Sequence, residues 1–457
     1  MATIQSLPPE LLKRCFKFVC ITALSSVNTA VLKSLSLICR AWRNPAQKLL
    51  FSNVKITQAR RLRIFLLHGT RIELAQAVKR LQLFIHGDGG TTTIAPRDAI
   101  VPGDLAKLLG FLPSIVEIDV TFERTTVLHD VTLEMVAFAD VRPKALRITC
   151  MSPDRSLVAA QLCSIWPSVE HVSLTGSAEV IRAPGASKPQ FELYEYEWKC
   201  ARQESGDHLQ WILHNSRDSL QILSISILPD DVVFLSMLLT KLRGSLRSLR
   251  LPRAPKRLLT TLPGLTKLEE FKVTESIPSS SVLNALPLTV EHLAFGVKPK
   301  PNRQSLILGT KFSPSSPANS SPTAPPPTKS VGLGSPRSSP VLSRSKAAAA
   351  IVGSNPNAQK ETKSSSNSSL EDILEYVRKA PSLRTVTYSW CQEEGSSDVV
   401  ALKVLCVERG IDLRCFRHEF GWYSPSEREE LIKCNKFPRY VPISKAHSRV
   451  PSTPYAG

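Results

Sequence analysis

The chain has 457 residues, of which 42% are hydrophobic and 21% charged, and a formal net charge of +19; this is a globular composition with room for two to four domains of roughly 100–200 residues. Its 10 cysteines form no Cys-x-x-Cys pair and lie mostly in apolar runs, which favours a reducing compartment, cytosol or nucleus, and argues against a secreted disulfide scaffold. We expect neither a membrane span nor a signal peptide, because the longest apolar run, Val232–Leu239, is far shorter than ~20 residues and no basic stretch precedes an apolar one at the N-terminus.

The first sixty or so residues predict three short amphipathic helices. Leu7-Pro8-Pro9-Glu10 opens the first, with prolines where a first helical turn tolerates them and an acid near the positive helix end. Apolar residues then recur at spacings of three and four: Leu11, Leu12, Cys15, Phe16 and Val19 in the first helix, and Val31, Leu35, Ile38 and Trp42 in the second, which we expect Asn44-Pro45 to interrupt. A third apolar turn follows at Ala46–Phe51. A unit this small buries little surface, so we expect it to rest on a partner or on the rest of the chain.

These residues resemble an F-box. The family's Leu-Pro-x-Glu-Leu-Leu with a following Phe is present in Leu7–Phe16, its Leu-x-Leu-Ile-Cys-Arg-x-Trp helix in Leu35–Trp42, and its fungal-type ending in Ala46–Val54. The sequence departs from the family in a longer loop before Cys39 and in Cys15, where the family more often has Ile. The resemblance implies docking onto the Skp adaptor of a cullin-type ubiquitin ligase. It also implies the residues that contact the adaptor or support the contact: Leu7, Pro8, Leu11, Leu12, Phe16, Leu35, Ile38 and Trp42. A plain helical subdomain is the alternative.

A second signal repeats from residue 78 onward, in the form apolar-x-x-apolar-x-apolar. Its copies are Val78–Leu83, Ile115–Val120, Val169–Leu174, Leu220–Ile225, Leu246–Leu251, Leu268–Val273, Val290–Phe295 and Leu383–Tyr388, with a weaker one at Ala145–Ile148. Most steps between copies match the 20–29 residues of a leucine-rich repeat, and the long gap between Leu174 and Ile225 suggests one degenerate unit.

The segments between these expected strands predict helices, at Asp104–Leu112, Leu157–Trp166, Leu209–His214, Asp231–Leu242 and Leu370–Val377. A helix stopped by proline and followed by a short strand is one turn of a solenoid. The Asn usual after Leu-x-Leu is missing, which puts the regularity of the array in doubt. We therefore expect an α/β fold, a three-helix F-box followed by an irregular leucine-rich-repeat-like solenoid; an unrelated α/β domain is the alternative.

Residues 298–369 interrupt this array. They hold 11 Pro, 18 Ser and a single aromatic, Phe312, a composition that predicts disorder. No acid occurs from His292 to Lys360, whereas nine Lys and Arg do, so much of the net charge belongs to this segment. Because the repeat pattern resumes at Leu370, the expected organisation is an F-box over 1–56, a solenoid over 57–297, a basic linker over 298–369, a continuation over 370–426 and a tail over 427–457.

The linker also contains five Ser-Pro pairs, which proline-directed kinases recognise, at Ser313, Ser316, Ser321, Ser335 and Ser339. Each phosphate adds about −1.5 to −2 charge, so full phosphorylation would cancel the basic charge. The segment would then act as a charge switch for acidic surfaces; the alternative is a soluble spacer.

No motif of an enzyme is found. The sequence has no phosphate-binding Gly-x-x-x-x-Gly-Lys loop, no His-Glu-x-x-His and no Gly-x-Ser-x-Gly, and its histidines lie at no metal-ligand spacing. We expect a protein without catalytic residues, metal or cofactor. We do not expect nucleic acid as the partner, since the linker offers basic residues without aromatic stacking platforms. The basic segment Lys241–Arg257 has two interpretations, a solvated face or a site for an acidic partner.

The sequence thus favours a substrate-recruiting adaptor, as the F-box resemblance implies. Its target would bind the strand positions that alternate with the inward apolar ones: Asp119, Arg147, Ser173, Ser224, Arg250, Lys272 and Thr387. These side chains are chemically mixed, so no class of target protein follows from them. The alternatives are a repeat scaffold unconnected with a ligase and a nucleic-acid-binding protein that uses its basic surface.

Overall fold

The computed structural model describes residues 7–20, 29–68, 72–87, 98–151, 155–176, 179–180, 188–200, 206–229, 231–296, 370–390 and 397–417. The chain divides into two compact units, Met1–Pro299 with Ser368–Gly457 and Lys300–Asn367, and all described residues belong to the first. The linker expected over 298–369, its five Ser-Pro pairs and the tail expected over 427–457 lie outside the described residues.

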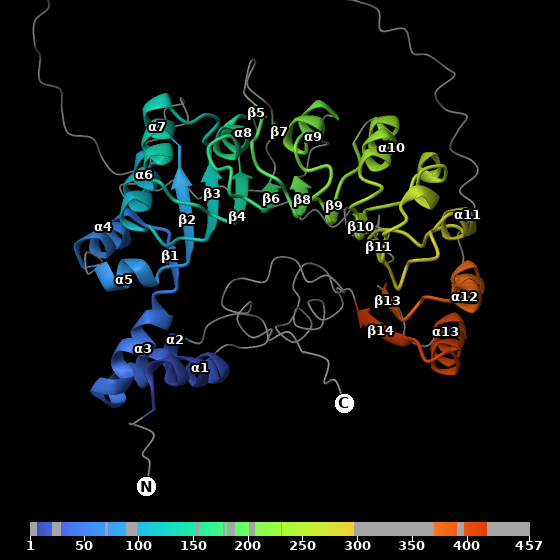
Figure 1. The fold of residues 1–457 in the computed structure, drawn as a ribbon, viewed down its shortest axis with the longest axis horizontal. Helices are drawn as coiled ribbons and strands as arrows, with labels where there is room; N and C mark the ends of the chain where they lie inside the picture. Colours follow the sequence, from blue (N-terminus) through green and yellow to red (C-terminus); the bar gives the residue numbers. More distant parts are fainter. Residues whose placement is uncertain are drawn as a thin grey trace, which may run out of the picture. The chain divides into compact units, whose positions relative to one another are not determined.

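The first unit is a mixed α/β structure built on a 12-stranded parallel sheet, so the α/β class expected from the sequence is confirmed (Figure 1). Within this sheet, each strand pairs with the next of its strands in chain order. The strands are β1 (Asn53–Ile56), β2 (Arg80–His86), β3 (Glu117–Glu123), β4 (Ala145–Met151), β6 (His171–Gly176), β8 (Glu195–Cys200), β9 (Ile222–Ile225), β10 (Ser248–Leu251), β11 (Glu270–Val273), β12 (His292–Gly296), β13 (Thr385–Trp390) and β14 (Asp412–Arg417). Strands β5 (Arg155–Ser156) and β7 (Glu179–Val180) form a separate pair.

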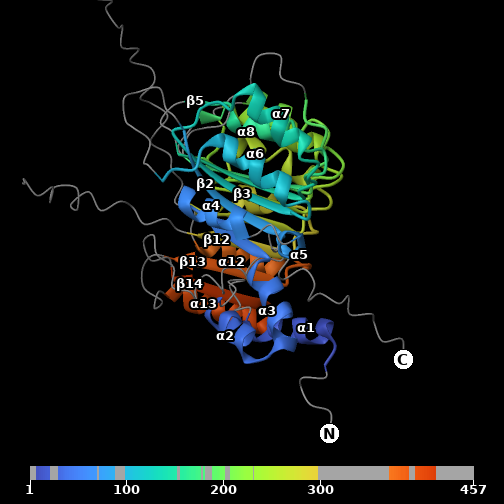
Figure 2. The same cartoon turned by 90° about the vertical axis from the view of Figure 1, so that its left-hand side faces the viewer.

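Thirteen α-helices are found in the described part of the chain. Three precede the sheet: α1 (Pro9–Cys20), α2 (Thr29–Ile38) and α3 (Arg40–Leu50). The others are α4 (Ala59–His68), α5 (Ile72–Ala77), α6 (Pro102–Phe111), α7 (Asp130–Phe138), α8 (Val158–Cys163), α9 (Gly206–Ile212), α10 (Val232–Lys241), α11 (Ser280–Asn284), α12 (Leu370–Lys379) and α13 (Ser397–Glu408), with short 3₁₀ turns at Lys256–Leu258 and Leu262–Gly264. Helices α6 to α13 lie along one side of the strand row (Figure 1), and α6 and α7 are neighbours in that layer (Figure 2).

Local sequence explains where several helices begin. Pro102 is the first residue of α6, and the Asp104 carboxylate accepts a hydrogen bond of 3.2 Å from the backbone N–H of Val101. The side chain of Asp231 accepts hydrogen bonds from the N–H groups of Val233 and Phe234, at 2.9 and 3.1 Å, and so caps α10. These helices connect parallel strands, which a tight turn cannot do.

The repeated apolar positions of the sequence form the core between sheet and helices. Register places Leu81, Ile118, Leu146, Val172, Tyr196, Leu223, Leu249, Phe271, Leu293 and Val386 in one row across the strands, and all are buried. Tyr196 belongs to β8, the strand in the long gap of the sequence pattern. Because side chains alternate along a strand, the residues on either side of this row lie on the opposite face of the sheet.

Two expectations about helices were wrong. Trp42 belongs to α3 rather than to the second helix, because the chain turns at Cys39, whose φ of −156° and ψ of 167° are extended. Pro45, expected to interrupt a helix, is buried inside α3, next to the core residue Ala46, although proline cannot make the helical backbone hydrogen bond. Helix α7 was not predicted, because its apolar residues Val131, Met135 and Phe138 face outward and give no pattern of a buried face.

The sheet continues across the long gap in the described chain, between residues 296 and 370. Strand β13 pairs in parallel with β12, with Leu293 opposite Val386, and α12 packs beside α11. The described residues before and after this gap therefore belong to one continuous sheet.

Candidate functional site

The three N-terminal helices enclose a small core of their own. Leu12, Phe16, Leu32, Ala46 and Leu49 are buried together, and the ring of Phe16 meets the ring of Trp42 edge-on, with centroids 5.3 Å apart. Leu12 and Phe16 are only 3% and 4% exposed. Helices α2 and α3 supply the partners of these two side chains. Any contribution of these two side chains to partner binding is support for the helices rather than contact.

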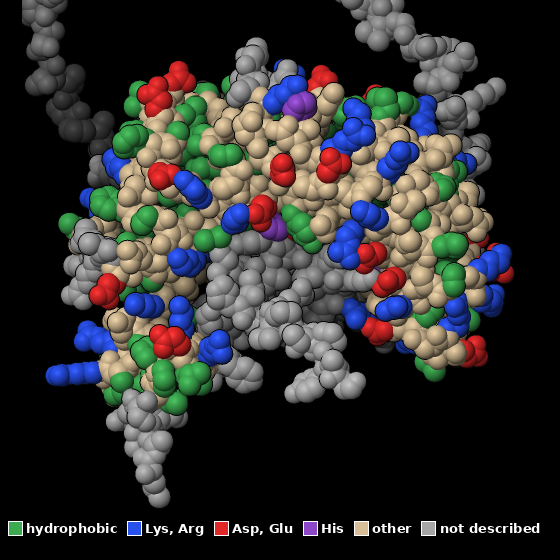
Figure 3. Space-filling model, viewed as in Figure 1, with side chains coloured by type: hydrophobic (Ala, Val, Ile, Leu, Met, Phe, Trp, Pro, Cys, Tyr) green, Lys and Arg blue, Asp and Glu red, His purple; other side chains and the backbone are tan. Residues whose placement is uncertain are grey.

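Other residues of the expected adaptor site are on the surface. Pro8 is exposed, Leu11 is 44% exposed and Ile38 is 59% exposed. Leu7, Leu35 and Trp42 are half-buried and pack against the small core. Hydrophobic side chains gather over these helices (Figure 3). Leu37 of α2 is 85% exposed and was not among the expected residues. The available signal was that Leu37 is the second leucine of the Leu-x-Leu block.

The seven residues expected to bind a target lie in one row across the sheet. Register aligns Gln82, Asp119, Arg147, Ser173, Glu197, Ser224, Arg250, Lys272, Ala294, Thr387 and Arg414. A neighbouring row on the same face holds Arg80, Glu117, Ala145, His171, Glu195, Ile222, Ser248, Glu270, His292, Thr385 and Asp412. We call the row that begins at Arg80 the first polar row, and the row that begins at Gln82 the second polar row. Glu197 was missed, because its strand β8 interrupts the repeat pattern.

Glu117 organises the N-terminal end of the first row. Its Oε1 lies 3.2 Å from Arg80 Nε and 3.2 Å from Arg147 Nε, and Arg80 also meets Asp119 at 2.9 Å. The side chain of Glu117 is 1% exposed. Burial raises the pKa of this carboxyl group, and the two arginines only partly offset the effect.

Glu270 organises the C-terminal end of the same row. Its Oε1 accepts hydrogen bonds from Arg250 Nε and from the Ser248 hydroxyl, both at 2.7 Å, and its Oε2 lies 3.1 Å from His292 Nδ1. His292 Nε2 lies 2.8 Å from the Thr387 hydroxyl on β13, which joins the two sides of the long gap. Burial alone would raise the pKa of Glu270, but Arg250, His292 and Ser248 hold it well below its usual value.

This network corrects one expectation. Ser224, Arg250 and Thr387 were expected on an exposed binding surface, but they are 4%, 2% and 4% exposed. Strands less than 5 Å apart let long polar side chains lie over their neighbours and pair there, as Arg250 does with Glu270. Asp119, Arg147, Ser173 and Lys272 are only half-buried. A target that uses this face would meet those four directly.

The basic segment Lys241–Arg257 is not one patch. Arg247 pairs with Glu269 at 2.6 Å and Arg250 with Glu270 at 2.7 Å. Lys241 and Arg243 are exposed before β10 begins, whereas Arg253, Lys256 and Arg257 are exposed after it ends. The positive charges are thus divided between the two ends of a strand, which supports the interpretation as a solvated surface.

Within the described ranges, no cluster of three or more His, Cys, Asp or Glu could hold a metal ion. Burial raises the pKa of Cys163 to about 12 and that of Cys150 to about 11, so neither carries a nucleophilic thiolate near neutral pH. None of the helices in the described segments is long and apolar enough to cross a bilayer.

Comparison with known proteins gives no matching family model and no similar curated protein.

Proposed function

We propose that the protein is a substrate-recruiting adaptor subunit of a Skp–cullin–F-box ubiquitin ligase. The observation that supports this most is the coincidence of sequence and surface at the N-terminal helices: the ordered blocks that resemble an F-box fall on α1, α2 and α3, and these helices leave Leu11, Leu37 and Ile38 exposed beside a small core. Exposed apolar clusters of this kind mark protein interfaces.

The proposal includes a leucine-rich-repeat-like solenoid for the remainder of the first unit. Its support is the repetition of strand and helix in chain order, with apolar residues of successive repeats in one register and polar residues on the opposite face. In such arrays each repeat contacts only its neighbours, and one face is free for recognition.

Catalysis by such a subunit requires no reactive group of its own. The N-terminal helices would hold the adaptor, and the half-buried members of the polar rows would hold the target. A target lysine would then lie near a ubiquitin-loaded enzyme, and its effective concentration would rise.

The test measures binding of the full chain to a purified Skp-family adaptor by calorimetry. Leu11→Asp and Ile38→Asp place carboxylates on exposed positions, so we expect folding to be preserved and affinity to fall by at least tenfold or so, as when a hot-spot residue is lost. Leu288→Asp, at a 76% exposed position in a turn, is the matched control and should bind normally. Leu12→Asp is unsuitable, since it charges the small core and unfolds the helices.

Failure of the full chain to bind any Skp-family adaptor would refute the proposal. Equal binding by the unsubstituted chain and by the Leu11→Asp and Ile38→Asp double variant would refute the assigned surface. Recovery of nucleic acid without ligase subunits from cells would favour the alternative of a nucleic-acid-binding protein.

A further inference from the structure

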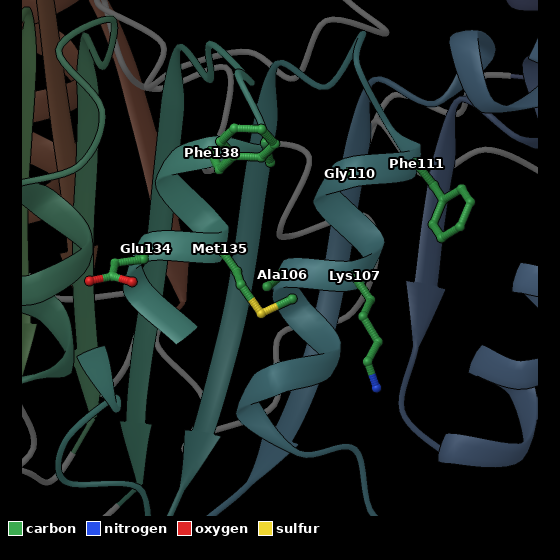
Figure 4. Close-up of a pocket in the computed structure, with 8 residues that line it drawn as sticks. Ala106, Lys107, Gly110, Phe111, Glu134, Met135 and Phe138 are labelled. Atoms are coloured by element: carbon green, nitrogen blue, oxygen red, sulfur yellow. The ribbon is translucent and has the colours of Figure 1, made fainter. Parts of the chain in front are cut away.

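A groove between α6 and α7 exposes more apolar surface than the fold requires. It has a volume of about 540 Å³ and is lined by Ala106, Lys107, Gly110, Phe111, Glu134, Met135, Phe138 and Ala139. Figure 4 shows Met135 reaching from α7 toward Ala106 on α6, with Phe138 above it. None of these residues belongs to α1–α3 or to the polar rows, so the groove is independent of the proposed adaptor and target sites.

The apolar side of α7 faces outward. Val131, Met135 and Phe138 recur at spacings of four and three and are 67%, 45% and 91% exposed, while Val136 of the same helix is fully buried. A phenylalanine exposed to this extent contributes nothing to the core. Single exposed apolar residues are common, but a stripe of them beside a groove marks a contact surface. Hydrophobic side chains are gathered over α6 and α7 in Figure 3.

The side of α6 that borders the groove is small. A Cβ atom added at Gly110, which lines the groove, would meet no atom within 4 Å, and Ala106, which also lines it, lies one turn earlier and is 4% exposed. Glycine costs helix stability relative to alanine, by up to about 1 kcal/mol, and no contact within the described chain requires Gly110. Small residues on an open helix face allow a second helix to approach closely.

The charges on the two rims identify the occupant. Lys107 extends from the far side of α6 and Glu134 from the far side of α7, so the rims carry opposite charges (Figure 4). A two-fold axis that runs along the groove places the α6 rim of one copy against the α7 rim of the other. Lys107 of each copy then meets Glu134 of the other copy, so the interface contains two such pairs. An isologous interface requires this kind of self-complementary patch. We propose that two copies of the chain pair through their α6–α7 grooves.

The dimer should be weak. Helices of 10 and 9 residues provide less area than the ~800 Å² per partner of a standard interface. We therefore expect a reversible, concentration-dependent association in the micromolar range or weaker.

Sedimentation equilibrium of the full chain, from about 1 to 500 µM, tests the proposal. The unsubstituted chain should shift from monomer toward dimer with rising concentration. Gly110→Leu fills the open groove and should abolish the dimer; its melting temperature should be unchanged or higher, because leucine is the better helix former. Met135→Glu should also prevent association, whereas Met237→Glu, at a similarly exposed position of α10, should not.

Charge reversal separates this pairing from other modes of association. Lys107→Glu or Glu134→Lys alone should weaken the dimer by about tenfold or more, since each contact occurs twice, and the double variant should restore it. Lys107 also lies 3.4 Å from Asp104 of its own helix, an exposed pair of little energetic value. A chain that stays monomeric throughout, a dimer that tolerates Gly110→Leu, or a double variant no stronger than the single ones would overturn the proposal.

Discussion

Glu117 and Glu270 occupy equivalent positions in the first polar row, yet their surroundings have opposite effects on them. Both side chains are almost completely buried. The pKa of Glu117 is raised by burial, whereas that of Glu270 is held low by Arg250, His292 and Ser248 despite burial. Burial is thus common to the two sites, and what differs is how completely each carboxylate is paired.

The geometry explains the difference. Both oxygens of Glu270 have partners, and Arg250 is only 3% exposed, so solvent screens this pair little. At Glu117 both arginines approach the same oxygen, without hydrogen-bond geometry, and their side chains are 19% and 35% exposed. The nearby charge of Asp119 opposes ionisation of Glu117 further. A buried charge is stabilised by the number and direction of its partners rather than by their mere presence.

The largest expected effect is that of Glu270→Ala. The substitution leaves the Arg250 guanidinium buried without its carboxylate, a change that costs about 3–5 kcal/mol in comparable sites. Glu117→Ala should cost distinctly less, because its arginines can turn toward solvent or toward Asp119. Urea denaturation of both variants measures the two free energies of unfolding. Equal losses would contradict the comparison.

The two sites should also respond oppositely to pH. The folded pKa of Glu270 lies below its usual 4.5, so the stability that it supplies is present above that pH and is lost as pH falls through the folded value. The folded pKa of Glu117 lies above 4.5, so its contribution makes the protein less stable as pH rises from 4.5 through the folded value.

Unfolding free energies between about pH 2 and pH 8, for the unsubstituted chain and for Glu117→Gln and Glu270→Gln, separate these contributions. The difference between the unsubstituted chain and Glu270→Gln should grow with pH. The difference between the unsubstituted chain and Glu117→Gln should shrink. Parallel curves for the two variants would show that the sites do not differ in protonation.

A smaller effect is expected when one partner is transferred between the sites. Ser248 lies beside Glu270 on the preceding strand, where Glu117 has Arg80, and Ala145 lies beside Glu117 on the following strand. Ala145→Ser should supply a hydroxyl donor, lower the pKa of Glu117 and stabilise the fold by about 0.5–1.5 kcal/mol, the net value of one hydrogen bond. Ala145→Cys, similar in size but a weaker donor, is the matched control, and both are compared by urea denaturation.

The sequence predicted the parts of the fold that repeat. Buried residues such as Leu249 and Phe271 recur at fixed positions, so most strands other than β8, and the row in which Asp119, Arg147 and Lys272 lie, followed from spacing alone. Burial of Arg250 and Thr387 could not be predicted, because it depends on Glu270 and His292 of neighbouring strands. The core position of Leu12 was missed because its partner Phe16 is buried by α3. Hydrophobic periodicity does not indicate that α3 begins as a separate helix after Cys39.

The pairing of β12 with β13 has a consequence for how the chain folds. His292 contacts Glu270, 22 residues before it, but contacts Thr387 95 residues after it. Loop-closure entropy grows by about 0.6 kcal/mol for each doubling of length, so this junction costs roughly 1.2 kcal/mol more than its neighbours. Distant contacts of this kind form late, and we expect the helices and strands from Leu370 onward to join the array after the preceding strands have formed. In native-state hydrogen exchange the amides of β13 and β14 would then open at a lower free energy than those of β10 and β11.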